Sequence, residues 1–252
     1  MRLNVYLQKA GVGSRREAER MVADGRIAVN GQRAAATTPV QEGDRVTLDD
    51  KPIAPATRAL PRLFLLHKPI DFLVTNRDPK GRPTIFDLDA LKPPRWRADM
   101  PRVMNVGRLD VNSEGLLVLS SDGALAQTMM SPATALSRVY RLRLRGRLSE
   151  DALAQLARGI EIDGIGYRGA EFVEEKDKGG RSNTWYRVLL TEGKNREIRK
   201  LVEHFGCMVN RLIRVQYGPF QLGNLQTGAV AEVPPAQVRN FLEFLEARQA
   251  RQ

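Results

Sequence analysis

The chain has 252 residues, 42% of them hydrophobic, and a formal net charge of +11. This length allows a small domain followed by a larger one. The sequence has no apolar run of about 18 residues, so we expect no membrane span. The N-terminus lacks the apolar core of a signal peptide, and Cys207 is the single cysteine. We therefore expect a disulfide-free cytoplasmic protein. The excess of arginine points to a polyanion, although charge alone does not separate RNA from DNA or an acidic membrane.

Residues 1–50 are predicted to form a small α/β domain. Apolar residues recur at helical spacing over 3–10, a capping box starts a second helix at Ser14, and Asn30-Gly31 is a strong hairpin signal. The outward basic side chains of these helices are Lys9, Arg15, Arg16 and Arg20. Nearby glutamates also allow an ordinary solvated face, but the global charge favours RNA contact.

Proline and alanine dominate residues 51–61, which we predict to be a linker. In residues 62–252, helices and strands mix without regular βαβ alternation. The chain as a whole is therefore predicted to be α+β, with a mostly antiparallel mixed sheet in its second domain. Residues 77–101 read as a long loop in which arginine and tryptophan interleave, which fits either RNA binding or a disordered insert.

Residues 139–148 alternate cleanly, as a strand with two different faces does. One face carries Arg141, Arg143, Arg145 and Arg147. The other face carries Tyr140, Leu142 and Leu144, so Tyr140 should point inward. Residues 195–205 are predicted to be a helix with an apolar stripe that includes Ile198 and with arginines around it.

Several familiar chemistries lack their residues. His67 and His204 lie far apart with no Cys or acidic cluster at ligand spacing, so a metal site is not expected. No phosphate-binding loop of the Gly-x4-Gly-Lys type is present. Residues 164–169 match the letters of a dinucleotide fingerprint, but the alternating residues after them predict a hairpin instead.

Asp110 is the most informative candidate for catalysis. It ends Gly107-Arg108-Leu109-Asp110, in a polar loop that leads into an apolar strand at residues 116–119. A carboxylate in this position can be held rigidly while it faces a cleft. Spacing alone also allows a purely structural turn residue, because aspartate is common in turns.

These residues resemble the signature of the RsuA-type ribosomal RNA pseudouridine synthases. The resemblance begins with Gly107 to Asp110 and continues through Ser113-Glu114-Gly115-Leu116-Leu117. Its later parts are Arg138-Val139-Tyr140, Glu192 to Lys200, and Arg211 to Val215 followed by Tyr217-Gly218. Residues 2–48 are similar to the S4 RNA-binding domain that precedes this type of catalytic domain.

The resemblance implies a cofactor-free isomerisation with Asp110 as the catalytic group. Arg199 is expected to pair with Asp110 and keep it ionised, and Tyr140 to stack on the target base. Ile198 and Leu212 would form the apolar wall of the base pocket. Arg108 would fill the space of the extruded base or contact a phosphate. Lys194 and Arg196, within the third motif, are further candidate substrate-binding residues.

Within the family, residues 81–87 and 183–186 look most like the branch that modifies large-subunit (23S) ribosomal RNA, the RluB type. Ribosomal RNA or a ribosomal-subunit precursor is then the expected partner of a monomeric enzyme. His67 departs from the aromatic residue that the family more often has before Lys68-Pro69. The alternatives are a small-subunit (16S) enzyme, a non-catalytic ribosomal RNA-binding assembly factor and a DNA-binding regulator.

Overall fold

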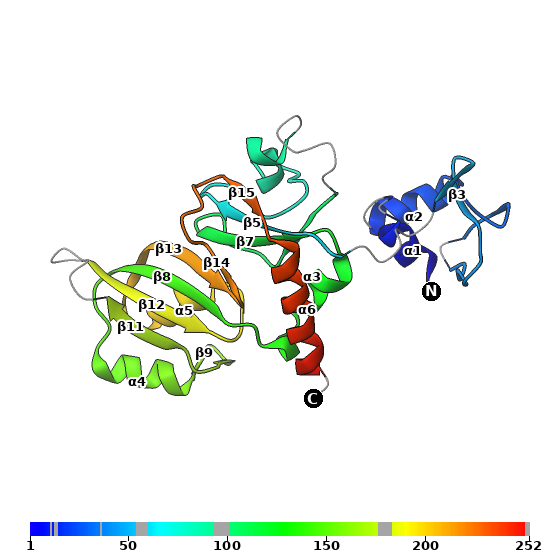
Figure 1. The fold of residues 1–252 in the computed structure, drawn as a ribbon. Coiled ribbons are helices and arrows are strands. Elements are labelled where there is room, and N and C mark those ends of the chain that lie inside the picture. Colours follow the sequence, from blue (N-terminus) through cyan, green and yellow to red (C-terminus); the bar gives the residue numbers. More distant parts are fainter. Residues whose placement is uncertain are drawn as a thin grey trace. The chain divides into compact units, whose positions relative to one another are not determined.

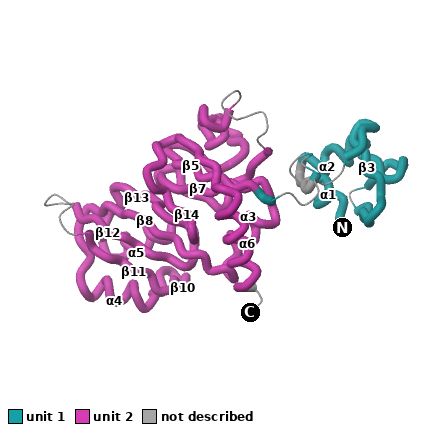
Figure 2. Tube along the Cα trace, viewed as in Figure 1, with its two compact units in different colours: residues 1–61 teal, residues 62–252 magenta. Residues whose placement is uncertain are grey.

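The computed structural model describes residues 1–10, 12, 15–35, 37–53, 60–92, 101–175 and 183–249. The chain divides into two compact units, residues 1–61 and 62–252 (Figures 1 and 2). The architecture is α+β, as the sequence predicts, with helices and a mostly antiparallel sheet in the larger unit. No helix among the described residues combines the length and the apolar character needed to cross a membrane.

The first unit packs two short helices beside a four-stranded antiparallel sheet of order β2-β1-β3-β4. Its core is built from residues that include Leu3, Leu7 and Ile27. Its elements are α1 (Leu3–Lys9), α2 (Arg15–Ala23), β1 (Ile27–Val29), β2 (Gln32–Arg33), β3 (Val46–Leu48) and β4 (Lys51–Ile53).

The start of the predicted linker is wrong. Lys51–Ile53 pair with Val46–Leu48 as strand β4, and the Ile53 carbonyl accepts a hydrogen bond from the Tyr6 hydroxyl. A proline can occupy this position because β4 lies at the edge of the sheet, where one side of the strand needs no donor. Residues 54–59 of the predicted linker lie outside the described residues.

The second unit is built on a nine-stranded mixed sheet. Seven strands follow the order β11-β12-β8-β13-β7-β5-β15, while β14 pairs with β13 and β6 pairs with β7. The strands are β5 (Leu63–Lys68), β6 (Met104–Val106), β7 (Glu114–Ser120), β8 (Arg138–Arg145), β11 (Glu171–Glu175), β12 (Asn183–Leu190), β13 (Met208–Tyr217), β14 (Phe220–Gln221) and β15 (Val230–Glu232). Among the strand pairs that the structure describes in this sheet, β13 and β7 alone are parallel, which agrees with the predicted antiparallel character.

Helices and a small hairpin complete this unit (Figure 1). The predicted hairpin at residues 164–169 is confirmed by the antiparallel pairing of β9 (Ile160–Ile162) with β10 (Ile165–Tyr167). The helices are α3 (Gly123–Met130), α4 (Glu150–Arg158), α5 (Glu197–His204) and α6 (Pro235–Gln249), with 3-10 turns η1 (Ile85–Asp87), η2 (Asp89–Leu91) and η3 (Pro132–Thr134). The Ser149 side chain caps α4 by accepting a hydrogen bond from the Ala152 amide.

One face of the sheet forms the main core. The alternation of β8 buries Tyr140, Leu142 and Leu144 against apolar residues of α4 and α5, as predicted from the sequence. Cys207 is also buried in this core, where it acts as a small packed side chain. Burial of this face fixes the position of α5 relative to the sheet, and the residues that approach Asp110 come from α5.

Candidate active site

Asp110 lies in the loop between β6 and β7, which begins with a turn at Gly107. Gly107 has a φ of 72°, a left-handed conformation that glycine adopts without steric cost. The backbone carbonyl of Asp110 accepts a hydrogen bond from the Ser113 amide, at 3.0 Å. Its side chain keeps 33% exposure, and no hydrogen bond to its carboxylate is found among the described residues. The loop therefore uses the backbone of Asp110 for the turn and leaves the carboxylate accessible.

Two arginines of the α5 region approach that carboxylate. Arg199 Nε lies 3.8 Å from Asp110 Oδ2, and Arg196 Nη1 lies 3.9 Å from the same oxygen. Both are ion pairs at distances slightly beyond direct hydrogen bonds. Arg199 Nε is buried and has no hydrogen-bonding partner in the described part of the chain. Two cations therefore lie beside the carboxylate without saturating its oxygens.

Arg196 reaches Asp110 from an unusual backbone conformation. It caps α5 with φ 52° and ψ 31°, in the left-handed region that is uncommon for a long side chain. Such strain persists only where surrounding contacts enforce it, and it is concentrated at functional sites. The backbone carbonyl of Arg196 also accepts the first helical hydrogen bond, from the Lys200 amide.

Three residues, of which Lys68 and Arg199 are buried, donate hydrogen bonds to the main chain of the Asp110 loop. The Val111 carbonyl accepts from the Asp71 amide, and the Asn112 carbonyl accepts from Arg199 Nη2 at 3.0 Å. Lys68 Nζ donates to the carbonyls of Ser113 at 2.8 Å and Val111 at 3.4 Å. Lys68 is the end of β5 and is fully buried. The loop is therefore fastened to both β5 and α5.

Burial lowers the pKa of Lys68 to about 8, although Asp110, Asp71 and Glu114 oppose this shift. The unfolded chain keeps this proton up to about pH 10.5, whereas the folded chain releases it near pH 8. Between these values the unfolded state binds more protons, so the free energy of unfolding should rise with pH, by at most about 3 kcal/mol. Denaturant titrations at pH 7.5 to 10.5 should show this rise in wild type relative to Lys68→Met. Parallel curves for the two proteins would contradict it.

An apolar wall lies beside the Asp110 loop. Tyr140, Ile198 and Leu212 are buried and belong to the same core cluster as Leu109, the residue before Asp110. Leu212 pairs with Leu142 across β13 and β8, so it shares the face of Tyr140. Through Leu109, the loop that carries Asp110 therefore joins the same core cluster as these three predicted pocket residues.

Close packing of two strands positions the end of the loop. Gly115 has a φ of 104°, and a Cβ atom there would lie 2.3 Å from the Arg214 carbonyl oxygen. No other residue fits this contact without moving β7 away from β13. Arg214 is buried, and its Nε donates to the Leu116 carbonyl at 2.7 Å. Gly115 therefore allows β7 to start directly against β13.

The remaining predicted substrate-binding residues have different surroundings. Lys194 Nζ donates to Glu192 and to the Gly166 carbonyl, so its ammonium serves internal contacts. Arg108 is exposed, directly before the buried Leu109. In the first unit Arg20 is exposed on α2. The side chains of Lys9, Arg15 and Arg16 lie outside the described residues.

Sequence reasoning missed Lys68 and Asp71. The available signal was a lysine at the end of an apolar strand directly before a proline, since a charged group in this position needs several acceptors. His67, which stands where the family more often has an aromatic residue, places its Nδ1 2.7 Å from the Leu225 carbonyl oxygen. His67 therefore contacts the β15 side of the sheet.

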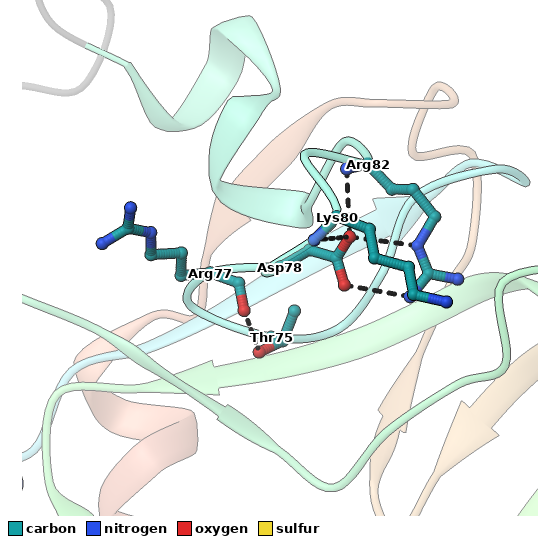
Figure 3. A network of polar contacts seen from close by, with 5 residues as sticks. All are labelled: Thr75, Arg77, Asp78, Lys80 and Arg82. Carbon is teal, nitrogen blue, oxygen red and sulfur yellow. Dashed lines mark hydrogen bonds and ion pairs between the residues drawn. The ribbon is translucent and has the colours of Figure 1, made fainter.

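A basic loop, residues 75–82, follows β5 (Figure 3). Asp78 accepts hydrogen bonds from the backbone amides of Lys80 and Arg82 and from the Arg82 guanidinium. These contacts lower the pKa of Asp78 to about 2. Thr75 donates to the Arg77 carbonyl, and the Arg77 side chain points away from the network. This part of the predicted long loop is therefore ordered, whereas residues 93–100 lie outside the described residues.

Replacing Asp78 with alanine should loosen this basic loop. The variant loses two backbone caps and the partner of Arg82, so we expect the KM for RNA to rise about tenfold while kcat changes little. Steady-state kinetics against the RNA substrate would measure both. The exposed Asp163→Asn, in the β9–β10 turn, is the matched control. An equal loss of kcat would contradict a role confined to binding.

Comparison with known proteins identifies the family to which the chain belongs. The family model described as RNA pseudouridylate synthase matches residues 62–204, and the S4 domain model matches residues 1–46. The chain belongs to the RNA pseudouridylate synthase family, and it carries an S4 domain before an RsuA-type synthase domain. It is therefore an RNA pseudouridine synthase.

Among curated relatives, an uncharacterized RNA pseudouridine synthase of Rickettsia felis is 38% identical over 92% of this chain and 96% of its own length. The ribosomal large subunit pseudouridine synthase B of Xanthomonas campestris is 41% identical over 88% of this chain. The match covers only 44% of that longer relative. A crystal structure of a pseudouridylate synthase, 22% identical, has the same fold over 95% of this chain and 98% of its own, with a TM-score of 0.63.

Proposed function

We propose that this protein converts a uridine of large-subunit ribosomal RNA to pseudouridine, with Asp110 as the catalytic carboxylate. The observation that carries the proposal is the accessible Asp110 carboxylate, held within 4 Å of Arg196 and Arg199. The name of the Xanthomonas relative supports the choice of large-subunit RNA. The Rickettsia relatives are uncharacterized and leave that choice to experiment.

The reaction breaks the bond between ribose C1′ and uracil N1, turns the base, and joins C1′ to C5. The proton of C5 leaves and N1 gains one, so no atoms are lost overall and no oxidant or reductant is required. Asp110 either attacks the nucleoside or removes a ribose proton, and both routes require the ionised carboxylate. Arg199 and Arg196 place two positive charges beside that carboxylate, where they orient it.

The target base must leave its stack to meet Asp110, at a cost of a few kcal/mol. Tyr140 offers a ring for stacking, with Ile198 and Leu212 as the apolar wall. Arg108, exposed two residues before Asp110, is suited to occupy the vacated space or to bind a phosphate. We propose that Tyr140 also assists loss of the C5 proton.

The choice of RNA is tested with purified protein and the two ribosomal RNAs. Transcripts of 23S and 16S RNA labelled with tritium at uridine C5 release tritium when pseudouridine forms. We expect release from the large-subunit transcript at one position, identified afterwards by chemical mapping. Release confined to the small-subunit transcript would reject the proposed substrate while leaving the enzyme class intact.

The domain boundaries and the role of the first unit are part of this proposal. We propose that the S4 domain, about residues 1–53, binds the ribosomal RNA through Lys9, Arg15, Arg16 and Arg20. Replacing Arg15 and Arg16 together with glutamate should weaken RNA binding and reduce its dependence on salt, because fewer counterions are released. Fluorescence anisotropy over a salt series checks both effects. Affinity equal to wild type at every salt concentration would exclude this role.

A further inference from the structure

A second basic surface lies on the side of the sheet away from the core. It is formed by one face of three neighbouring strands, β12, β8 and β13. Register pairs Trp185 and Arg211 with Arg143, pairs Arg187 with Arg141, and pairs Asn183 with Arg145. Directly paired residues share a face. We call this surface the arginine face, and its members are Arg141, Arg143, Arg145, Trp185, Arg187 and Arg211.

Neither α4 nor α5 covers the arginine face. The apolar residues of both helices belong to the core cluster with Leu142 and Leu144, which point to the other side of β8. Arg145 and Arg187 are exposed, and the side chain of Arg211 is 53% exposed. Within the described part of the second unit, the arginine face is therefore open to a partner molecule.

The charges on this face are only partly balanced. Arg141 pairs with Glu175 at 2.7 Å, and Arg211 pairs with Glu114 at 2.5 Å. Arg143, Arg145 and Arg187 have no carboxylate partner among the described residues. Register also places Arg141 opposite Arg187, and Arg143 opposite Arg211.

Like charges directly opposite each other destabilise a sheet. Glu175 and Glu114 each balance only one arginine of the two opposed pairs, so Arg187 and Arg143 keep charges that a bound anion would relieve. Arg143 Nε is in addition buried and lacks a hydrogen-bonding partner in the described structure. The acidic residues of this side are Glu171 and Glu175 on edge strand β11 and Glu114 on β7, so none lies on the three central strands β12, β8 and β13. The centre of the face is thus built for a polyanion.

An aromatic residue distinguishes this surface from a plain solvated face. The Arg141 guanidinium lies 4.7 Å from the Trp185 ring centroid while it also binds Glu175. This stacking fixes an aromatic ring among the arginines. Guanidinium groups grip phosphates, and an aromatic ring provides a platform for a base, which together form the usual surface for single-stranded RNA.

We infer that the arginine face binds the phosphate backbone of an RNA strand outside the segment that enters the active site. This rests on the chain's acting on RNA, but it does not depend on which uridine reacts. The face lies on the opposite side of β8 from Tyr140. The surface therefore adds affinity and a second point of orientation without touching the reacting base.

The test compares two double variants with the same change in net charge. Arg145→Glu with Arg187→Glu alters the arginine face, whereas Arg158→Glu with Arg239→Glu alters exposed arginines on α4 and α6. The probe is an end-labelled transcript of large-subunit ribosomal RNA, measured by anisotropy over a salt series. We expect the arginine-face variant to bind at least about tenfold more weakly, with a salt slope lower by about 1.5 to 2. The control variant should stay within about twofold of wild type.

Equal losses of affinity in both double variants would overturn the inference, since net charge alone would then explain them. The milder Arg145→Gln with Arg187→Gln, checked by circular dichroism, removes the charges without adding acids and should give a smaller loss in the same direction. With saturating RNA, kcat of the arginine-face variant should equal that of wild type. Failure of wild type itself to form pseudouridine would count against the proposed function and leave the binding result standing.

Discussion

Replacing Asp110 with asparagine should abolish pseudouridine formation, with kcat lowered by at least about 10³-fold. Asparagine keeps the size and the backbone turn but has no negative charge with which to attack a nucleoside or accept a proton. Tritium release from uridine-labelled ribosomal RNA measures the loss. RNA affinity, measured by anisotropy, should stay close to wild type because Asp110 contributes no cation to the RNA interface.

The matched control is Asp163→Asn, in the turn between β9 and β10. Its left-handed backbone suits asparagine as well as aspartate, and it makes the same chemical change far from the site in sequence. We expect this control to retain full activity. Asp110→Asn with more than a tenth of wild-type activity would reject Asp110 as the catalytic group.

Replacing Arg199 with alanine should have the second largest effect. Arg199 both faces Asp110 Oδ2 at 3.8 Å and donates to the Asn112 carbonyl, so its loss frees the carboxylate and the main chain together. We expect kcat to fall by about 10²-fold to 10³-fold. Loss of the buried group should also destabilise the fold by about 3 kcal/mol, because it leaves buried groups unpaired. Steady-state kinetics and denaturant unfolding separate the two effects.

Two further variants distinguish positioning from folding. Arg199→Lys keeps the charge but loses the planar fork, so it should recover stability more than activity. Lys200→Ala changes the next residue on α5, whose side chain makes no hydrogen bond or ion pair with the Asp110 loop in the described structure. This variant should keep nearly wild-type activity and stability. An activity of Arg199→Lys equal to wild type would show that charge alone suffices.

Local patterns in the sequence predicted much of this site. Alternation over residues 139–148 predicted that Tyr140 lies on the buried face of a strand, and the structure confirms that orientation in β8. The strand ends at Arg145, so Arg147 lies beyond it. The apolar stripe of residues 195–205 likewise predicted α5 and put Ile198 in the core. Such patterns work because the burial of a strand or helix face depends on residues close together in the chain.

The contacts that hold Asp110 could not be derived from periodicity. Lys68 lies more than forty residues before Val111 and Ser113, the loop residues whose carbonyls accept its hydrogen bonds. Arg199 lies 87 residues after Asn112. These hydrogen bonds depend on the order β13-β7-β5, which mixes a parallel with an antiparallel pair. The pairing with Arg199 was expected from family resemblance, whereas the contribution of Arg196 to Asp110 appeared only in three dimensions.

The boundary at residue 50 shows a different limitation. Lys51 and Pro52 looked like the beginning of a linker because proline seldom continues a strand. An edge strand tolerates proline, and pairing with β3 supplied the tertiary context that the local sequence lacked. The core of the first unit, by contrast, followed directly from the apolar spacing of α1 and α2.

Mapping of pseudouridine across both ribosomal RNAs in cells that lack this gene tests the central proposal most directly. The protein is restored either as wild type or as Asp110→Asn, at equal expression. We predict that one pseudouridine of the large-subunit RNA disappears without the gene, returns with wild type, and stays absent with Asp110→Asn. An unchanged pseudouridine map in the deletion strain, or full restoration by Asp110→Asn, would contradict it.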